Sequence, residues 1–389
     1  MSRLQHLAKL VMTQGALGER PFVALENVET GTGRLLVNGA LPMRSESDIG
    51  CAAIEPGDVL FGKLRPYLAK SWLCDQPAYA STELLALRPT DIADSRWLGY
   101  LMSSRPLIEW SVATSEGSKM PRTSWEKLRL FSLSSVPSVA DQRLIADYLD
   151  RETVRIDALI LKKVGFQSLL DEKIGSLIQE RVGDIPTRRR LRHLAILGTG
   201  HTPDRRNSEY WENCVVPWVT AEDLSSRGNP FEMLMNTRQK ISELGVANSS
   251  AVVHPRGTVM LCRTASIGLI CQIGIPMATT QAFVTWSPGP ELDSAFLMYA
   301  LHSMRQEWMR LAFGSTHDTI YMPDLESVTI PYVPLAEQIA ISREIDTSTS
   351  QILKAKELLN RQCETLKERR QALITAAVTG ELNVPEVAA

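Results

Sequence analysis

The sequence lacks the signatures of the common catalytic and metal centres. Gly198-Thr-Gly200 has neither the length nor the lysine of a phosphate-binding loop. Asn229-Pro-Phe231 lacks the second proline of the Asn-Pro-Pro-aromatic motif found in adenine methyltransferases. No serine stands in a Gly-x-Ser-x-Gly elbow, and the histidines never fall into a zinc-binding spacing. We therefore expect no catalytic residue, no metal and no bound cofactor in this chain.

The chain also lacks a basic coat, a cysteine framework and long apolar runs. Lysine and arginine number 42 against 44 aspartates and glutamates, which weakens a nucleic-acid interpretation. It does not exclude one, because cations can gather on local faces. The 6 cysteines form no CxxC pair, which indicates reduced core residues of a cytoplasmic protein. No apolar run reaches membrane-spanning length and no signal-peptide pattern opens the chain, so we expect no membrane contact.

What the chain does have is a strict seven-residue apolar repeat near its end. The repeat positions are Ile345, Ile352, Leu359, Leu366 and Leu373. Such a narrow stripe suits the contact line of a coiled coil, although a single amphipathic helix on a globular core is the alternative. Pro334 fits a first helical turn and Gly380 a helix end, so we predict one long helix in this region.

The same helix occurs a second time, 196 residues earlier. The equivalent positions are Leu149, Ile156, Lys163, Leu170 and Leu177, and only Lys163 is not apolar. We call the nine apolar positions of the two helices the seam. Flanking residues match as well, since Asp141-Gln142 corresponds to Glu337-Gln338 and Gly57-Asp-Val-Leu60 to Gly257-Thr-Val-Met260. This duplication predicts two similar globular domains, each followed by one long helix.

Each globular half mixes short strands with helices, which predicts an α+β fold. In the first half we expect a helix over residues 1–12, strands at 22–25, 59–61 and 84–87, and one helix over 97–110. In the second half we expect strands at 215–219 and 258–261 and one helix over 295–311. The predicted domains are residues 1–136 and 185–333, and the long helices with their linker and tail are residues 137–184 and 334–389.

The loops between the expected strands carry polar residues that differ between the halves. An extended strand after Gly62 would place Lys63, Arg65 and Tyr67 on one face, with Lys70 and Trp72 continuing the alternation. Cations beside aromatic rings suit phosphates and base edges, although a solvated strand face is the alternative. The equivalent stretch 262–266 is less basic, and Thr316-His-Asp318 stands where the first half has Lys119-Met-Pro-Arg122. Two related domains that recognise different ligands would differ in their loop residues in this way.

Taken together, several segments resemble the specificity, or DNA-recognition, subunits of type I restriction–modification enzymes. In the first half they are Leu25-Glu-Asn-Val28, Gly31-Thr-Gly33, and the segments 57–68 and 117–125. In the second half they are Gly198-Thr-Gly-His-Thr-Pro203, Glu209-Tyr-Trp211, Pro217-Trp-Val-Thr220, Pro334-Leu-Ala-Glu-Gln338 and Val378-Thr-Gly380. The resemblance covers essentially the whole chain. The first half departs from it at Pro137-Ser-Val-Ala-Asp-Gln142, where Pro-Leu-x-Glu-Gln is usual.

The resemblance implies that each globular domain is a target-recognition domain reading half of a split double-stranded DNA sequence. The candidate DNA-contacting residues are Lys63, Arg65, Tyr67, Lys70, Lys119, Arg122, His201, Arg263, Thr264, Ser266, Thr316 and His317. The long helices are expected to form an antiparallel coiled coil that sets the spacing and docks two modification subunits. Those subunits carry S-adenosylmethionine, and restriction subunits join them. The alternatives are an assembly scaffold without DNA or, with less support, a fused methyltransferase or nuclease.

Overall fold

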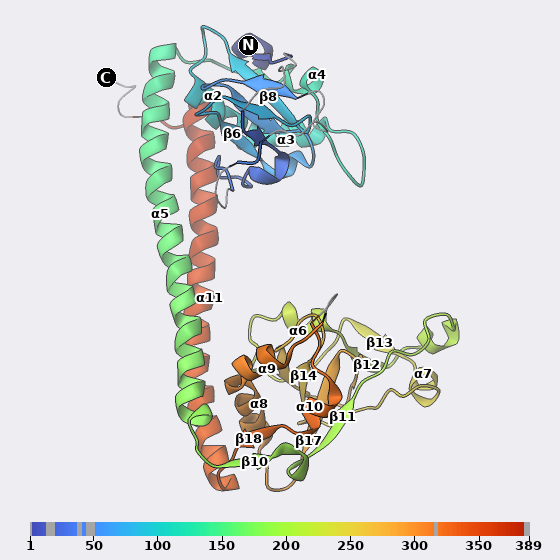
Figure 1. The fold of residues 1–389 in the computed structure, drawn as a ribbon. Coiled ribbons are helices and arrows are strands. Elements are labelled where there is room, and N and C mark those ends of the chain that lie inside the picture. Colours follow the sequence, from blue (N-terminus) through green and yellow to red (C-terminus); the bar gives the residue numbers. More distant parts are fainter. Residues whose placement is uncertain (1, 13–19, 37–40, 44–50, 315–317, 385–389) are drawn as a thin grey trace. The chain divides into compact units, whose positions relative to one another are not determined.

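The computed structural model describes residues 2–12, 20–36, 41–43, 51–314 and 318–384. The chain divides into two compact units, unit 1 (Met1–Lys163 and Arg361–Ala389) and unit 2 (Val164–Asn360). Each unit contains one globular domain and part of both long helices, α5 (Val139–Ile178) and α11 (Leu335–Thr379) (Figure 1). The α+β class is confirmed. Because the units divide both helices, the domain boundaries drawn from the sequence stay a prediction.

The described part of the globular domain of unit 1 is built from short strands, single helical turns and short helices. Its strands are β1 (Ser2–Arg3), β2 (Ala8–Leu10), β3 (Phe22–Val23), β4 (Ala52–Ile54), β5 (Val59–Gly62), β6 (Ser71–Leu73), β7 (Ala78–Ala80), β8 (Leu84–Pro89) and β9 (Ser132–Leu133). Its helical segments are α1 (Leu4–Leu7), η1 (Leu25–Asn27), η2 (Pro66–Leu68), α2 (Ser95–Met102), α3 (Arg105–Ala113) and α4 (Trp125–Leu128).

The globular domain of unit 2 has a comparable set of elements. Its strands are β10 (Arg188–Arg190), β11 (Ala195–Thr199), β12 (Val216–Val219), β13 (Gln239–Ile241), β14 (Val259–Cys262), β15 (Ile270–Gln272), β16 (Ala278–Thr279), β17 (Phe283–Pro288) and β18 (Thr329–Pro331). Its helical segments are η3 (Gln179–Gly183), η4 (Leu191–His193), η5 (Ser208–Trp211), α6 (Ala221–Ser225), α7 (Glu243–Ala247), α8 (Ser294–Ser303), α9 (Arg305–Leu311) and α10 (Met322–Glu326).

The two units share one sheet topology, which confirms the internal duplication. The four-stranded sheet has the order β2-β8-β5-β6 in unit 1 and β11-β17-β14-β15 in unit 2, antiparallel throughout. Each unit adds a three-stranded sheet with one parallel pair, β3 with β7 and β12 with β16. In each domain a two-stranded sheet, β1-β9 or β10-β18, pairs the first strand of the domain with the strand that precedes its long helix. The matching segments 57–60 and 257–260 therefore lead into β5 and β14, which are inner strands of equivalent sheets.

Four expected elements differ from the structure. The helix predicted over residues 1–12 is one turn, α1, because Ala8–Leu10 pairs with β8 instead. The strand predicted over 22–25 ends at Val23, where the Ala24 N–H turns to the side chain of Asn27. The helix over 97–110 is broken into α2 and α3, because Pro106 cannot continue the hydrogen-bond ladder and instead fits the first turn of a new helix. The helix over 295–311 is likewise interrupted, between α8 and α9.

A buried glutamine joins each globular domain to the start of its long helix. In unit 1 the Gln142 Oε1 accepts a hydrogen bond from the N–H of Asp94 at 2.7 Å. The Nε2 of Gln142 donates to the carbonyl oxygens of Ile92 and Pro137, both at 2.9 Å. In unit 2 Gln338 makes the three equivalent bonds, at 2.8, 3.1 and 2.7 Å. The repeated acidic-residue–glutamine pair of the sequence is therefore a structural contact.

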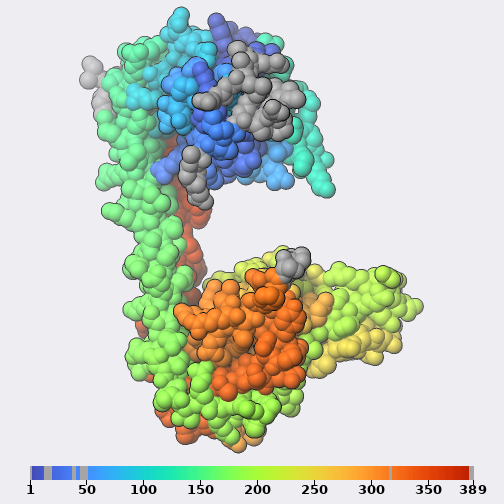
Figure 2. Space-filling model, viewed as in Figure 1, coloured from blue at the N-terminus to red at the C-terminus, as the bar shows by residue number. Residues whose placement is uncertain are grey.

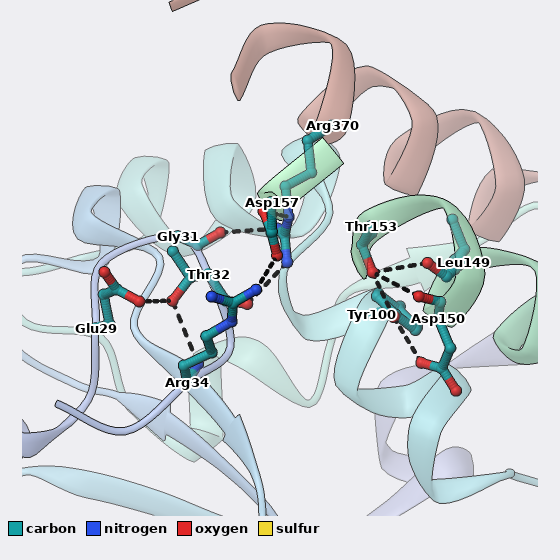
Figure 3. Close-up of polar contacts among 10 residues, drawn as sticks. All are labelled: Glu29, Gly31, Thr32, Arg34, Tyr100, Leu149, Asp150, Thr153, Asp157 and Arg370. Carbon is teal, nitrogen blue, oxygen red and sulfur yellow. Dashed lines mark hydrogen bonds and ion pairs between the residues drawn. The ribbon is translucent and has the colours of Figure 1, made fainter. Parts of the chain in front are cut away.

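A tyrosine adds a second equivalent contact between domain and helix in each unit. The Tyr100 hydroxyl donates to the Asp150 carboxylate at 2.7 Å, and the Tyr299 hydroxyl to Asp346 at 2.5 Å (Figure 3 shows the first). Burial raises the pKa of both tyrosines well above the ordinary value, and the carboxylate acceptors raise it further. Both hydroxyls therefore stay protonated donors over the whole neutral range.

The seam residues are all buried or half-buried. Leu149, Ile156 and Ile345 are buried, and Leu170, Leu177, Ile352, Leu359, Leu366 and Leu373 are half-buried. In unit 1 the Lys163 Nζ, at the polar exception, donates to the Gln362 side chain at 2.5 Å. The helices run antiparallel within each unit, since residues with rising numbers on α5 contact residues with falling numbers on α11.

In the described part of the chain, no helix has both the length and the hydropathy to cross a membrane.

The glutamine contact generates a stability prediction. Gln338→Met keeps the side-chain length but leaves one partly buried N–H and two carbonyl oxygens without their partner. We expect the free energy of unfolding to fall by roughly 2–4 kcal/mol, measured by chemical denaturation. Arg343→Ala, at an exposed position on the same helix, is the control and should leave stability nearly unchanged. Equal stability of both variants would contradict the role of Gln338.

Candidate nucleic-acid interface

In unit 1 the turn between β5 and β6 is not the extended strand that its alternating residues suggested. Arg65 and Ala69 have left-handed backbone, with φ of 50° and 48°, and η2 lies between them. The single face expected from the alternation is therefore wrong, because Trp72 is buried in the core while Arg65 and Tyr67 are exposed. A left-handed residue other than glycine costs roughly 1–2 kcal/mol, so this turn stores backbone strain.

The basic loop lies beside this turn. Residues 116–122 form a hairpin closed by two backbone bonds of 2.9 Å between Glu116 and Arg122. The Arg65 N–H donates to the carbonyl oxygen of Pro121 at 2.8 Å. Lys119 is exposed in this hairpin, which projects from unit 1 in aquamarine in Figures 1 and 2. The fold thus brings residues 63–67 and 119–122, distant in sequence, into one loop cluster.

Three of the predicted cations in unit 1 are engaged by the protein. The Arg122 guanidinium forms an ion pair with Glu83, 3.0 Å apart. The ammonium groups of Lys63 and Lys70 donate to main-chain carbonyl oxygens at 2.6 and 2.9 Å. Burial lowers the pKa of Lys63, and the charge of Arg122 acts in the same direction against the opposing effect of Glu83. These contacts shape the loop cluster and leave Lys63 and Lys70 less free to meet a ligand.

Arg65, Tyr67 and Lys119 are the side chains of this cluster that remain available. All three are exposed, and within the described ranges none of their side chains forms a hydrogen bond or ion pair. Lys119 and Arg65 bring two positive charges, and Tyr67 brings an exposed ring. A guanidinium offers paired donors in a fixed plane, whereas an ammonium acts as a mobile point charge.

Unit 2 repeats the strained turn with other side chains. Ala265, equivalent to Arg65, also has left-handed backbone, with φ of 61°. Its N–H donates to the carbonyl oxygen of Asp318 at 3.0 Å, just as that of Arg65 donates to Pro121. The left-handed position is thus a property of the shared scaffold. The side chain that it displays changes from a cation to a methyl group.

A cavity of about 560 Å³ lies beside this second turn. Its lining residues are Thr202, Arg205, Trp218, Thr220, Arg263, Thr264, Thr280, Gln281, Ala282 and Thr319. The predicted Arg263 and Thr264 meet here with Arg205, Gln281 and Thr202, which were not among the predicted residues. The available signal was the aromatic motif around Trp211 and Trp218, which follows the two arginines 205 and 206.

The polar groups of this cavity are oriented by their neighbours. The Arg205 guanidinium lies 5.1 Å from the ring centroid of Trp211 and 5.8 Å from that of Trp218, a cation–π geometry. The Thr202 hydroxyl donates to the Gln281 side chain at 2.5 Å. One Arg263 nitrogen donates to a main-chain carbonyl at 3.3 Å, while its buried Nε–H has no acceptor among the residues described. A buried donor without a partner is a candidate ligand contact.

The other predicted residues of unit 2 are less informative. His201 is exposed, and its backbone N–H donates to Thr279 at 3.0 Å. Ser266 is half-buried within the turn. Thr316 and His317 lie outside the described residues. Where the structure describes the chain, it holds no group of three His, Cys, Asp or Glu side chains suited to a metal ion.

Comparison with known proteins points to one family. Residues 187–361 match the family model of the type I restriction modification DNA specificity domain. The type I restriction enzyme MjaIX specificity subunit of Methanocaldococcus jannaschii is 28% identical over 168 residues, covering 41% of this chain. The match spans 38% of the length of that relative.

Two solved structures share the fold over almost the whole chain. One comes from a study of complex assembly and conformational transition of the type I R-M system. It has a TM-score of 0.75 at 20% identity and covers 98% of this chain and 97% of that chain. The HsdS subunit from Thermoanaerobacter tengcongensis has a TM-score of 0.51 at 20% identity, covering 98% and 96%. At this identity the likeness shows the fold.

The close packing of Gly200 against Thr279 in unit 2 generates a stability prediction. A Cβ atom at Gly200 would lie 2.1 Å from the carbonyl oxygen of Thr279, so that backbone must shift. We expect Gly200→Ala to lower the free energy of unfolding by roughly 1–3 kcal/mol, measured by denaturation. Gly228→Ala is the matched control, because a Cβ there meets no atom within 4 Å. Indistinguishable unfolding of the two variants would refute this close packing.

Proposed function

We propose that this chain, which belongs to the specificity subunits of type I restriction–modification systems, selects the double-stranded DNA sequence on which such a system acts. In this proposal each globular domain reads one half of a bipartite target through its strained turn and the loop beside it. The recurrence of a left-handed residue at positions 65 and 265 carries the proposal. Both copies keep this costly backbone while they change the side chains that it displays, as expected of a shared reading scaffold.

The two clusters offer different recognition chemistry. In unit 1 the Arg65 guanidinium can donate two hydrogen bonds to the O6 and N7 of guanine, and Lys119 suits a phosphate. In unit 2 Arg205 and Arg263 supply positive charge, while Gln281 has the amide that pairs with adenine. Two cations thus stand at each proposed reading surface, and local charge of this kind is compatible with DNA binding at a net charge of −2.

The long helices serve assembly in this proposal. They set the spacing between the half-sites and dock two modification subunits, which bind S-adenosylmethionine and methylate the DNA. Restriction subunits join that core. Val154 and Leu161, one heptad apart on α5, are 65% and 63% exposed, which supports a protein contact on this helix. A scaffold without DNA leaves the strained turns and the unpaired Arg263 donor unexplained.

One prediction of this proposal concerns catalysis. The chain supplies specificity and assembly, so the purified polypeptide alone transfers no methyl group and cuts no DNA. Incubation with labelled S-adenosylmethionine and plasmid DNA checks both activities, with the complete complex as the positive control. Label incorporation or cleavage by the chain alone would refute this division of labour.

A second prediction separates base reading from phosphate binding in unit 1. Arg65→Ala should lose preference at one position of one half-site, worth roughly 1–3 kcal/mol, because a paired donor is removed. Lys119→Ala should weaken binding evenly across sequences and lower the salt-dependence slope by about one unit. Dissociation constants of the assembled complex for matched and single-mismatch duplexes, over a salt series, measure both effects.

The control for this experiment is Lys9→Ala, which removes an exposed cation from the same unit outside the loop cluster. It should leave both the ranking of duplexes and the salt slope unchanged. If Arg65→Ala ranks every duplex as the unmodified chain does, Arg65 does not read a base.

A further inference from the structure

A surface loop of unit 1 is bound to the helix pair by a partly buried polar cluster (Figure 3). Arg370 of α11, which is 9% exposed, donates from Nη1 to the Gly31 carbonyl at 3.1 Å and from Nη2 to that of Thr32 at 2.8 Å. Its Nε lies 3.1 Å from Oδ1 of Asp157 on α5, an ion pair without hydrogen-bond alignment. Oδ2 of Asp157 accepts from Arg34 at 2.5 Å. We call these five residues the Arg370 clasp.

The loop is shaped to meet Arg370. Gly31 and Gly33 have left-handed backbone, with φ of 69° and 79°, which glycine adopts at little cost. The loop is closed by the Glu29 N–H, which donates to the Arg34 carbonyl at 2.9 Å, and by the Thr32 hydroxyl, which donates to the Glu29 carboxylate at 2.6 Å. The carbonyl oxygens at the loop tip are left to accept from the guanidinium. Hydrogen bonds of this charged kind are stronger than neutral ones.

The same loop contacts the strained turn of the candidate interface. The Gly31 N–H donates to the Ala69 carbonyl at 3.3 Å. Ala69 is one of the two left-handed residues that flank η2, and Arg65 is the other. Lys70 adds a bond to the carbonyl of Leu25, in the η1 turn that precedes the loop. A continuous series of contacts therefore runs from α11, through the loop, to the turn that displays Arg65.

Unit 2 is built differently at the equivalent place. The residues 196 positions from Arg370 and Asp157 are Ile174 and Leu353, both apolar. A cavity of about 720 Å³ lies there, and Ile174, Leu353 and Gly228 are among its lining residues. The ion pair between Lys356 and Asp171, which also line this cavity, joins the two helices to each other and does not involve the loop. The polar connection between helix and loop belongs to unit 1 alone, among the residues described.

We infer that Arg370 is a positioning residue for the strained turn of unit 1. The clasp holds the loop, the loop holds the backbone at Ala69, and Arg65 and Tyr67 are thereby presented to DNA in one orientation. This inference rests on the proposed function, because it assigns Arg370 a part in reading one half-site. A change at position 370 then alters discrimination in the half-site read by unit 1 and leaves the other half-site unaffected.

The test compares assembled complexes that contain the unmodified chain, Arg370→Gln, Arg370→Lys or Arg369→Ala. Arg369 is the exposed neighbour of Arg370 and serves as the matched control. Methylation mapping first identifies the target, and dissociation constants are then measured on duplexes with one mismatch in either half. In the half-site read by unit 1, here called the first half-site, the ratio of mismatched to matched dissociation constants should fall on the order of tenfold with Arg370→Gln. Arg370→Lys should recover part of it, because an ammonium can donate to the same carbonyls, and Arg369→Ala should match the unmodified chain.

The outcomes separate this inference from the proposed function. An unmodified complex that prefers no duplex overturns the proposed function itself. An unmodified complex that discriminates, beside an Arg370→Gln complex with the same mismatch penalties in both halves, overturns the inference alone. Should Arg370→Gln fail to assemble, Arg34→Ala decides the comparison, since the side chain of Arg34 is 46% exposed. Unchanged first-half discrimination in that variant overturns the inference as well.

Discussion

The attachment of each globular domain to the first turns of its own long helix is the constraint on which the rest of the structure depends. The buried side chains of Gln142 and Gln338 each satisfy one partly buried N–H and two carbonyl oxygens. Tyr100 and Tyr299 each add a partly buried hydrogen bond from the hydroxyl to a helix carboxylate. Because unpaired polar groups are costly in a core, these contacts specify one orientation of domain on helix within each unit.

This repeated attachment leaves the loops on each domain free to diverge. The left-handed residue at 65 or 265 keeps the same backbone bond in both units, yet one copy displays an arginine and the other an alanine. The helix contacts diverge too, since Arg370 and Asp157 correspond to Ile174 and Leu353. One domain is therefore joined to the helices by charge, and the other leaves a cavity there. The two units therefore share one scaffold but differ in the side chains that their turns expose and in how the domain contacts the helices.

The candidate interface could be predicted only in part. Arg65, Tyr67 and Lys119 were found because basic and aromatic residues stand out in a neutral sequence, and they are exposed in one loop cluster. Trp72 lies in the core and not on the predicted face, because two left-handed residues interrupt the extended backbone and because residues 67 and 70 are three positions apart, which places them on opposite faces of a strand. Arg205 and Gln281 were missed, because loops distant in sequence bring them to Arg263 and no local pattern marks that meeting.

Elements whose cause is local or periodic follow directly from the order of the amino acids. A seven-residue repeat requires a long helix, Pro334 and Gly380 limit it, and two matched halves require one sheet topology twice. Contacts between residues that are distant along the chain became apparent only in the folded structure. Examples are Arg370 on Gly31 and Thr32, Arg65 beside Pro121, and Arg263 in the cavity with Gln281. Periodicity follows from a few successive residues, whereas a contact between distant segments depends on packing, charge and hydrogen bonding that the whole unit must satisfy together.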